Sequence, residues 1–229
     1  MRTSSLDKLI EQYKNQKAIV LGCGPSLADI KYSDIHELSS DYFVVTIKQT
    51  YFQFKELSHF HFFNCNNFIK YTGGNAKFIC CSPLDIDTGR RAIWGDQKID
   101  YFYQITNEKK LSQFDNLTEY FFRDSIGKYR GPGIMYEAVL PFLYNIGVSE
   151  VLTVGWDYHA SEGYVEHYYN ENKRKKMINP AHLPYIGENQ ESILNSKKVN
   201  EFFTKNNVLL RCLESKKCFL HTSIDRVCL

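Results

Sequence analysis

The chain has 229 residues, of which 43% are hydrophobic and 15% aromatic, and its formal net charge at pH 7 is +2. A chain of this length can bury a substantial core, so we expect a single domain over residues 1–229. Its basic residues are dispersed apart from residues 173–176, which excludes the usual basic footprint of a nucleic-acid-binding protein.

Apolar runs alternate with helical patterns along the chain. Short apolar runs predict strands at 17–22, 42–47, 59–64, 77–81, 119–123, 150–155 and 209–213. Helical periodicity predicts helices at 5–15, 133–146 and 190–205. This alternation is typical of an α/β domain with a mostly parallel sheet and helices on both faces.

Two polar and aromatic segments, 83–117 and 157–188, follow no regular period and are predicted to be irregular. The second is longer than an ordinary connection, so we predict that it forms a lid over the active site. It contains the basic run KRKK at 173–176, which we interpret as a solvated face. Contact of this run with an anionic membrane surface or an acidic glycan is the alternative.

The sequence carries no pattern for targeting, disulfides or structural metal. Residues 1–16 lack the apolar core of a signal peptide, and no stretch of about 18 apolar residues occurs. The seven cysteines lie mostly in apolar runs, as reduced core thiols do, and no histidine pair has metal-ligand spacing. The one DxD spelling, Asp85 and Asp87, lies between Pro83 and Gly89, so we interpret it as a turn, with metal binding as the alternative. We expect a cytoplasmic protein without metal.

The segment KAIVLGCGPSL, residues 17–27, is the most informative stretch, because an apolar strand ends there in two glycines. Gly22 and Gly24 have no Cβ, so their backbone N–H groups are expected to be exposed for close approach of a phosphate. Nucleotide handling is therefore the first hypothesis. A strand-to-helix turn with a purely structural role is the alternative.

The residue sequence of this turn excludes common nucleotide-binding motifs. A P-loop requires Gly-Lys-Ser/Thr, whereas Gly24 is followed by Pro25 and Ser26. A dinucleotide fingerprint or a methyltransferase motif requires an acidic residue at the end of the second strand, where this chain has Lys48 and Gln49.

Ligands of parallel α/β sheets bind outside the carboxyl ends of the strands. The residues expected there are polar, amide-bearing and basic, as a sugar nucleotide requires: residues 22–24, 48–49, 64, 123–130, 155–159 and 214. Each has a structural alternative, because Asp157 would suit a turn cap, His159 an exposed loop and Asn64 an Asx-turn.

The run VLGCGPSLADIKYSDI resembles the GNGPSL start of the bacterial sialyltransferases of glycosyltransferase family 42. Further matches follow in the same order at 48–52, 63–64, 133–139, 155–158, 164 and 185–187, so the resemblance spans about residues 17–220. It implies a Rossmann-like variant of the GT-A fold, a lid, and metal-independent, inverting transfer from a CMP-activated sugar.

The resemblance also implies residue roles. Asn64 would hold the cytidine or its phosphate, residues 155–158 would line the pocket, and Tyr164 would donate its hydroxyl to the leaving phosphate. The resulting nucleotide-binding set is Gly22, Cys23, Gly24, Ser26, Lys48, Asn64, Gly133, Gly155, Asp157 and Tyr158.

The chain departs from the family at several of these positions. Cys23 and Lys48 stand where the family has asparagines, and Glu188 follows Tyr-Ile-Gly where the family places its catalytic histidine. Glu188 would be a general base if burial raises its pKa, and an ordinary helix-start carboxylate otherwise. His159 is a candidate acid or phosphate donor, and Arg130 lies one residue out of register with the family's arginine.

We therefore expect a glycosyltransferase that moves a sugar, a CMP-linked keto-sugar such as sialic acid, to a glycan acceptor without a cofactor. The catalytic candidates are Glu188, His159, Tyr164 and Arg130. The alternatives are a pterin pyrophosphokinase-like enzyme using ATP and magnesium, and a noncatalytic sugar-nucleotide-binding module. Lipopolysaccharide or capsule assembly at the inner face of the membrane is implied by the resemblance, and peripheral membrane contact and homo-oligomerisation stay open.

Overall fold

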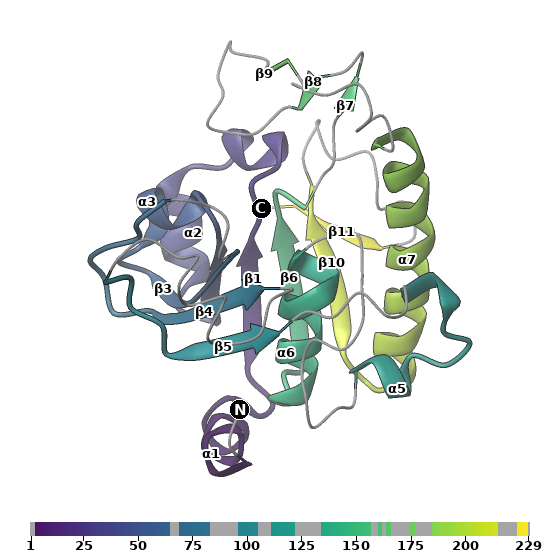
Figure 1. Ribbon diagram of the computed structural model, residues 1–229, viewed down its shortest axis with the longest axis horizontal. Helices are drawn as coiled ribbons and strands as arrows, with labels where there is room; N and C mark the ends of the chain where they lie inside the picture. Colours follow the sequence, from purple (N-terminus) through teal and green to yellow (C-terminus); the bar gives the residue numbers. More distant parts are fainter. Residues whose placement is uncertain are drawn as a thin grey trace.

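A parallel eight-stranded sheet forms the centre of the molecule (Figure 1). The computed structural model describes residues 3–64, 69–82, 96–104, 111–121, 134–156, 160–161, 164–165, 175–176, 185–214 and 224–228. In spatial order the strands are β11 (Asp225–Val227), β10 (Leu209–Leu213), β6 (Glu150–Val154), β1 (Lys17–Leu21), β2 (Tyr42–Ile47), β3 (Ser58–Asn64), β4 (Lys77–Ser82) and β5 (Tyr101–Gln104). Each neighbouring pair is parallel.

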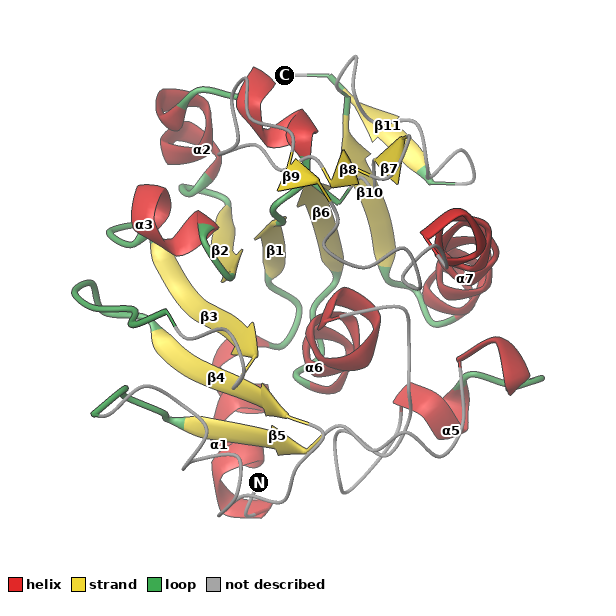
Figure 2. Cartoon of the chain, turned by 45° about the horizontal axis from the view of Figure 1, so that its top comes forward, coloured by secondary structure: helices red, strands yellow, loops and turns green. Residues whose placement is uncertain are grey.

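Helices cover both faces of this sheet (Figure 2). Ala18 and Val20 of β1 belong to a hydrophobic cluster with α1 (Thr3–Tyr13), the π-helical turn η4 (Met135–Val139), α6 (Leu140–Asn145) and α7 (Tyr185–Lys205). The alternate residues Ile19 and Leu21 belong to a second cluster with α2 (Tyr32–Leu38) and α3 (Thr50–Phe54). Strands buried on both faces are typical of doubly wound parallel sheets. The predicted α/β class, with helices on both faces, is confirmed.

The strand order reverses beside β1. The chain runs outward from β1 through β2, β3 and β4 to β5, and then returns to place β6 on the other side of β1. The register pairs Leu21 of β1 with Thr46 of β2 and with Val154 of β6. A topological switch point therefore lies between the carboxyl ends of β1 and β6, which is where open α/β sheets bind ligands.

A small antiparallel sheet lies beyond the carboxyl ends of the central strands. It consists of β7 (Ala160–Ser161), β8 (Tyr164–Val165) and β9 (Lys175–Lys176). Both views place it over the ends of β1 and β6 (Figures 1 and 2). These strands fall within the predicted lid, residues 157–188, most of which lies outside the described residues. The lid stays a prediction.

Six predicted strands have their expected positions. β2 and β10 occupy the predicted ranges, and β1, β3, β4 and β6 differ by one residue at one end. The strand predicted at 119–123 is wrong, because this stretch forms α5 (Thr118–Phe121). Leu117, Tyr120 and Phe121 are buried at helical spacing, and Asn116 Oδ1 accepts a hydrogen bond from the Thr118 N–H at 2.9 Å. The aromatic side chains suggested a strand, but tertiary packing selected the helix.

The remaining differences concern element ends and the irregular segments. β5 lies inside the segment predicted to be irregular at 83–117, and β11 was not predicted. The helix α1 begins and ends two residues before its predicted range, and α7 begins at Tyr185 within the second segment predicted to be irregular. The helix predicted at 133–146 is divided into η4 and α6. The other short helices are η1 (Pro25–Asp29) and η3 (Leu111–Gln113).

The described cysteines are free thiols. Cys80, Cys81 and Cys212 are buried, Cys23 is partly buried and Cys228 is exposed. The prediction of reduced core thiols is therefore confirmed for these strand cysteines, whereas Cys65 lies outside the described residues. No helix in the described part of the chain is long and apolar enough to cross a membrane.

Candidate functional site

The carboxyl edge of the sheet gathers several predicted site residues. Gly22 follows β1, Lys48 follows β2, Asn64 ends β3 and Gly155 follows β6. Because β6, β1, β2 and β3 are neighbouring parallel strands, these four positions lie along one edge. The structure therefore brings together residues that are up to 133 positions apart in the chain, counted from Gly22 to Gly155.

The two glycine turns at the switch point contact each other. The Gly22 N–H donates to the Val154 carbonyl at 2.7 Å, and the Gly24 N–H donates to the Gly155 carbonyl at 2.8 Å. The Gly155 N–H in turn donates to Ser26 Oγ at 3.0 Å. The expectation that the Gly22 and Gly24 amides are exposed for a phosphate is therefore wrong, because the neighbouring turn accepts both hydrogen bonds.

The close approach of these turns explains why they contain glycine. A Cβ on Gly22 would lie 2.4 Å from the Gly155 carbonyl oxygen, which is well inside van der Waals contact. A Cβ on Gly155 would lie 2.5 Å from the Gly22 carbonyl oxygen, and Gly155 has a φ of +67°. Ser26, predicted to bind the nucleotide, is 2% exposed, and its Oγ connects the same two turns by accepting the Gly155 N–H.

Cys23 connects the β1 turn to the turn after β2. Its thiol donates a hydrogen bond to the Ile47 carbonyl at 3.1 Å and lies 3.8 Å from Gln49 Oε1. Burial raises the pKa of the Cys23 thiol to about 11, although the positive charge of Lys48 and the backbone N–H groups of Thr50 and Gln49 act in the opposite direction. The thiol is therefore protonated at neutral pH and acts as a hydrogen-bond donor rather than as a nucleophile.

The turn after β2 places Lys48 in a left-handed conformation, with a φ of +52°. The Lys48 N–H donates to the Phe62 carbonyl at 2.8 Å, so the turn is attached to β3. Thr50 Oγ1 contacts the Leu21 carbonyl at 3.1 Å, so the turn is also attached to β1. Residues other than glycine rarely adopt this conformation without a functional or packing reason.

The edge also contains two polar side chains that have no partner among the described residues. Lys48 is half-buried, and no carboxylate within the described ranges forms an ion pair with it. Asn64 is half-buried as well, and its side-chain amide makes no hydrogen bond to any residue that the structure describes. An ammonium and an amide on neighbouring strands suit a ligand with an anionic group and hydrogen-bonding atoms.

The predicted catalytic residues are only partly placed. Glu188 lies in the first turn of α7, whose N-terminal end lies at the level of the carboxyl edge (Figure 1), and Tyr164 lies in β8. Their side chains are outside the described part of the structure. Other predicted residues lie entirely outside the described ranges, backbone included: His159, Arg130, Gly133, Asp157, Tyr158, Asp85 and Asp87.

Sequence reasoning missed two features, one next to this edge and one in the middle of α7. The first is the π-helical turn η4, whose residue Tyr136 packs its ring against Trp156 with centroids 5.2 Å apart. π turns are frequent at functional sites, and no simple sequence signal marks them. The second is Asn195 of α7, which is fully buried and whose amide has no hydrogen-bond partner among the described residues. Position 188 lies about two turns before Asn195 on the same side of the helix.

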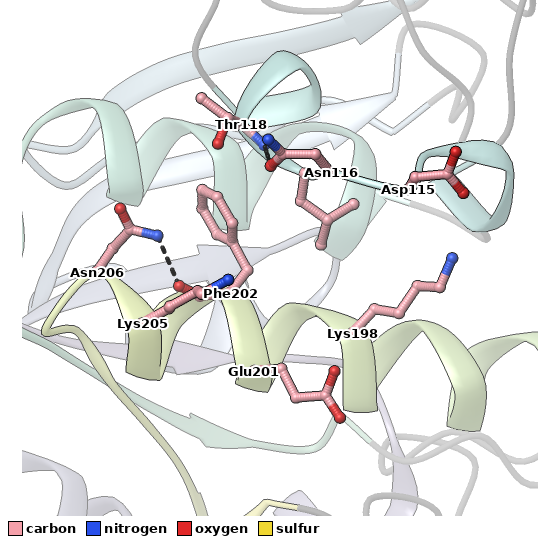
Figure 3. Close-up of a pocket in the computed structure, with 9 residues that line it drawn as sticks. Asp115, Asn116, Thr118, Lys198, Glu201, Phe202, Lys205 and Asn206 are labelled. Carbon is pink, nitrogen blue, oxygen red and sulfur yellow. Dashed lines mark hydrogen bonds between the residues drawn. The ribbon is translucent and has the colours of Figure 1, made fainter.

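A cavity of about 540 Å³ lies elsewhere, between α5 and the C-terminal half of α7 (Figure 3). It is lined by Asp115, Asn116, Leu117, Thr118, Lys198, Glu201, Phe202, Lys205 and Asn206. Because α7 leads into the start of β10, this cavity is at the amino-edge side of the molecule. None of its lining residues was predicted as a site residue. Within the described ranges, no group of three or more His, Cys, Asp or Glu side chains could hold a metal ion.

Comparisons with known proteins give a likeness to solved structures and none to a known sequence family. No protein-family model and no curated protein matches the sequence. Among solved structures, the chain is similar to the sialyltransferase CstII from Campylobacter jejuni in complex with a substrate analogue, cytidine-5'-monophosphate. The identity is 16%, the match covers 90% of this chain and 81% of that chain, and the TM-score is 0.46. At this low identity and TM-score, the roles of individual residues are inferred from the geometry of the carboxyl edge and not from the similar structure.

Proposed function

We propose that this protein is a glycosyltransferase that uses a nucleotide-activated sugar, with a CMP-linked keto-sugar such as sialic acid as its donor. The observation that carries the proposal is that Lys48 and Asn64 follow the neighbouring strands β2 and β3, on the same carboxyl edge as the switch point between β1 and β6. The ammonium suits the donor phosphate, and the amide suits the base, the ribose or the phosphate. The sequence resemblance supports cytidine as the nucleoside.

The proposed reaction is a metal-independent transfer with inversion. The bond between the anomeric carbon and the phosphate oxygen breaks, and its electron pair leaves with the CMP phosphate. The acceptor hydroxyl oxygen attacks the opposite face of the carbon, and Glu188 takes the hydroxyl proton as general base. Tyr164 and His159 are the proposed donors to the leaving phosphate, where negative charge develops.

The acceptor is proposed to be a glycan, and lipopolysaccharide or capsule assembly at the inner face of the membrane is the proposed setting. The sequence resemblance supports this part of the proposal. Vesicle flotation with anionic lipids and light scattering would test membrane contact and homo-oligomerisation.

Nucleotide binding is the first test of the proposal. Thermal shifts would be measured with CMP, CDP, UDP, GDP, ADP and ATP, each with and without magnesium, since a ligand at about 100 times its Kd adds roughly 2.7 kcal/mol of stability. We expect CMP to give a large shift that EDTA leaves unchanged. A shift with ATP that requires magnesium, and that Asp85→Asn abolishes, would favour the pyrophosphokinase-like alternative.

The position of the site is tested with Asn64→Ala. Removing a hydrogen-bonding amide costs about 1–3 kcal/mol, so the affinity for CMP should fall by about 5- to 150-fold. Asn75→Ala is the matched control, because Asn75 is an exposed asparagine in the loop before β4. Equal CMP affinity in the Asn64 variant and the parent would show that the site is misplaced. CMP binding without transfer or hydrolysis of a CMP-sugar would favour the noncatalytic module.

A further inference from the structure

Lys48 combines an unfavourable backbone conformation with a half-buried charge. Its φ is +52°, and the other described residues besides glycine with positive φ are Asn15 and Asn207. Asparagine tolerates the left-handed region several times better than most residues, whereas lysine has no such tolerance. A glycine or asparagine at position 48 would relieve this conformation. The conformation of the turn therefore does not explain why position 48 is a lysine.

The surrounding strands hold the Lys48 turn from two sides. On the β3 side, the Lys48 N–H donates to the Phe62 carbonyl at 2.8 Å. On the β1 side, the Cys23 thiol donates to the Ile47 carbonyl at 3.1 Å, one residue before Lys48. The thiol is also the group on which the Lys48 charge acts, since this charge lowers its pKa against the larger effect of burial. The two hydrogen bonds therefore hold the peptide group between Ile47 and Lys48 from the β1 side and the β3 side.

The carboxyl edge carries donors at the ends of three neighbouring strands, β1, β2 and β3. The Lys48 ammonium has no carboxylate partner within the described ranges, and the Asn64 amide on the neighbouring strand makes no hydrogen bond there. The backbone N–H of Cys23 also has no acceptor among the described residues, in contrast to those of Gly22 and Gly24. One ammonium, one amide and one backbone N–H form a donor set that suits the oxygen atoms of a phosphate.

We propose that Lys48 binds the phosphate of the ligand at the carboxyl edge and that Cys23 is the positioning residue that holds the Lys48 turn in place. The ligand class is a nucleoside phosphate whose phosphate lies at the ends of β1 and β2. This inference rests on the proposed function, because the same edge is the donor site. It assigns to Lys48 the neutralisation of phosphate charge and to the Cys23 thiol a hydrogen-bonding role without covalent chemistry.

The test compares CMP with cytidine, which lacks the phosphate. Isothermal titration would measure both ligands against the parent, Lys48→Met, Lys48→Arg and the control Lys8→Met, since Lys8 is exposed on α1. A charge-assisted hydrogen bond of ordinary strength corresponds to about a 10- to 100-fold change in affinity. We expect Lys48→Met to lose that factor for CMP and to keep the parent's cytidine affinity, while Lys48→Arg retains most CMP binding.

Lys48→Gly separates the ligand role from a structural role. Glycine relieves the left-handed backbone, so we expect the Tm to rise by about 2–4 °C while CMP affinity falls as in Lys48→Met. Asn207→Gly is the control for the backbone effect, because Asn207 has a φ of +59° and lies before β10 at the other edge. Parent-like CMP affinity in both Lys48→Gly and Lys48→Met would overturn the proposal.

The role of Cys23 is tested with Cys23→Ser and Cys23→Ala, measured well below their Tm. Serine keeps a donor for the Ile47 carbonyl, so it should retain CMP affinity, whereas alanine should lower it several-fold and leave cytidine binding unchanged. Equal CMP binding by both variants would overturn the positioning role. Orthophosphate and UMP serve as further probes. Lys48-dependent binding of these probes without CMP binding would reject the proposed donor and keep the phosphate site, and no binding of any phosphate probe would reject both.

Discussion

The buried histidine His61 predicts that this protein loses stability in mild acid. His61 lies in β3, is fully buried and is surrounded by the rings of Tyr51 and Tyr71, whose centroids lie 4.5 and 4.4 Å away. Its Nδ1 lies 3.0 Å from Thr46 Oγ1, and its Nε2 has no partner among the described residues. Burial lowers the pKa of His61 to about 3, because the charged imidazolium would lose its hydration.

The sign and size of the effect follow from proton linkage. The unfolded chain binds a proton at His61 below a pKa of about 6.5, whereas the folded protein does so only below about 3. The contribution of His61 to the free energy of unfolding is therefore fully present above pH 6.5 and is lost progressively as the pH falls from 6.5 to 3. Between pH 7.5 and 4.5 the loss is about 2.7 kcal/mol, at about 1.36 kcal/mol for each pH unit below 6.5.

Urea unfolding of the parent and of His61→Phe at pH 7.5, 6.5, 5.5 and 4.5 would measure this loss. Phenylalanine suits the aromatic surroundings, and Thr46 Oγ1 keeps its contact with Ser58 Oγ at 2.9 Å. We expect the free energy of unfolding of the parent to fall by about 2–3 kcal/mol more than that of the variant between pH 7.5 and 4.5. Comparing the two proteins cancels the contributions of other titrating groups.

The exposed histidine of α2 provides the control for this experiment. His36→Gln is the matched variant, because it removes an exposed histidine instead of the buried one. If His61→Phe and the parent lose equal stability in acid, His61 is not the group that couples folding to pH. If His61→Phe does not fold at neutral pH, His61→Gln provides the same comparison without the ring.

Three further variants test the glycine turns, the ion pair between Glu150 and Arg211, and the catalytic hypothesis. Gly155→Ala should lower the free energy of unfolding by at least about 2 kcal/mol, because its Cβ would lie 2.5 Å from the Gly22 carbonyl oxygen at a φ of +67°. Glu150→Ala should cost about 3 kcal/mol, because buried Glu150 accepts a hydrogen bond from Arg211 Nη2 at 2.8 Å and its loss leaves the arginine without that partner. Glu188→Gln should retain nucleotide affinity and lose about 100-fold or more in transfer rate.

Urea unfolding measures the first two variants, and a transfer assay measures the third. Gly147→Ala is the control for the glycine turn, since Gly147 has a φ of +79° but its Cβ would lie no closer than 3.4 Å to Lys14. Equal stability of the two alanine variants would mean that the contact between the turns does not require glycine. If Glu150→Ala is as stable as Glu11→Ala, an exposed control on α1, the ion pair between Glu150 and Arg211 does not stabilise the fold. Transfer at near-parent rates by Glu188→Gln would exclude Glu188 as base and make His159 or His182 the next candidates.

Local pattern was sufficient for much of the fold. The apolar runs of β2 and β10 lie at their predicted positions, because strands buried on both faces need continuous apolar residues. The strand prediction for 119–123 failed, because Phe121 belongs to α5 and packs its ring on Phe202 of α7. A short apolar run is compatible with both a strand and a helix, and a partner distant in sequence decides between them.

In the candidate site, too, local sequence predicted some features and contacts between distant segments decided others. The sequence placed Lys48, Asn64 and the glycine turns after successive strands, and the parallel sheet brings those strand ends to one edge. Local sequence contained no indication that the Gly22 and Gly24 amides bond to the β6 turn, because their acceptors, the carbonyls of Val154 and Gly155, lie more than a hundred residues away.

Local periodicity and turn residues were enough to predict the α/β class, the positions of most strands and the polar character of the carboxyl edge. The strand order, the contact between Gly22 and Gly155, the left-handed Lys48 and the burial of His61 became visible in the folded chain alone. Each of these depends on packing and hydrogen bonds between segments far apart in the chain. Such contacts have no local periodicity, so a reading of neighbouring residues does not detect them.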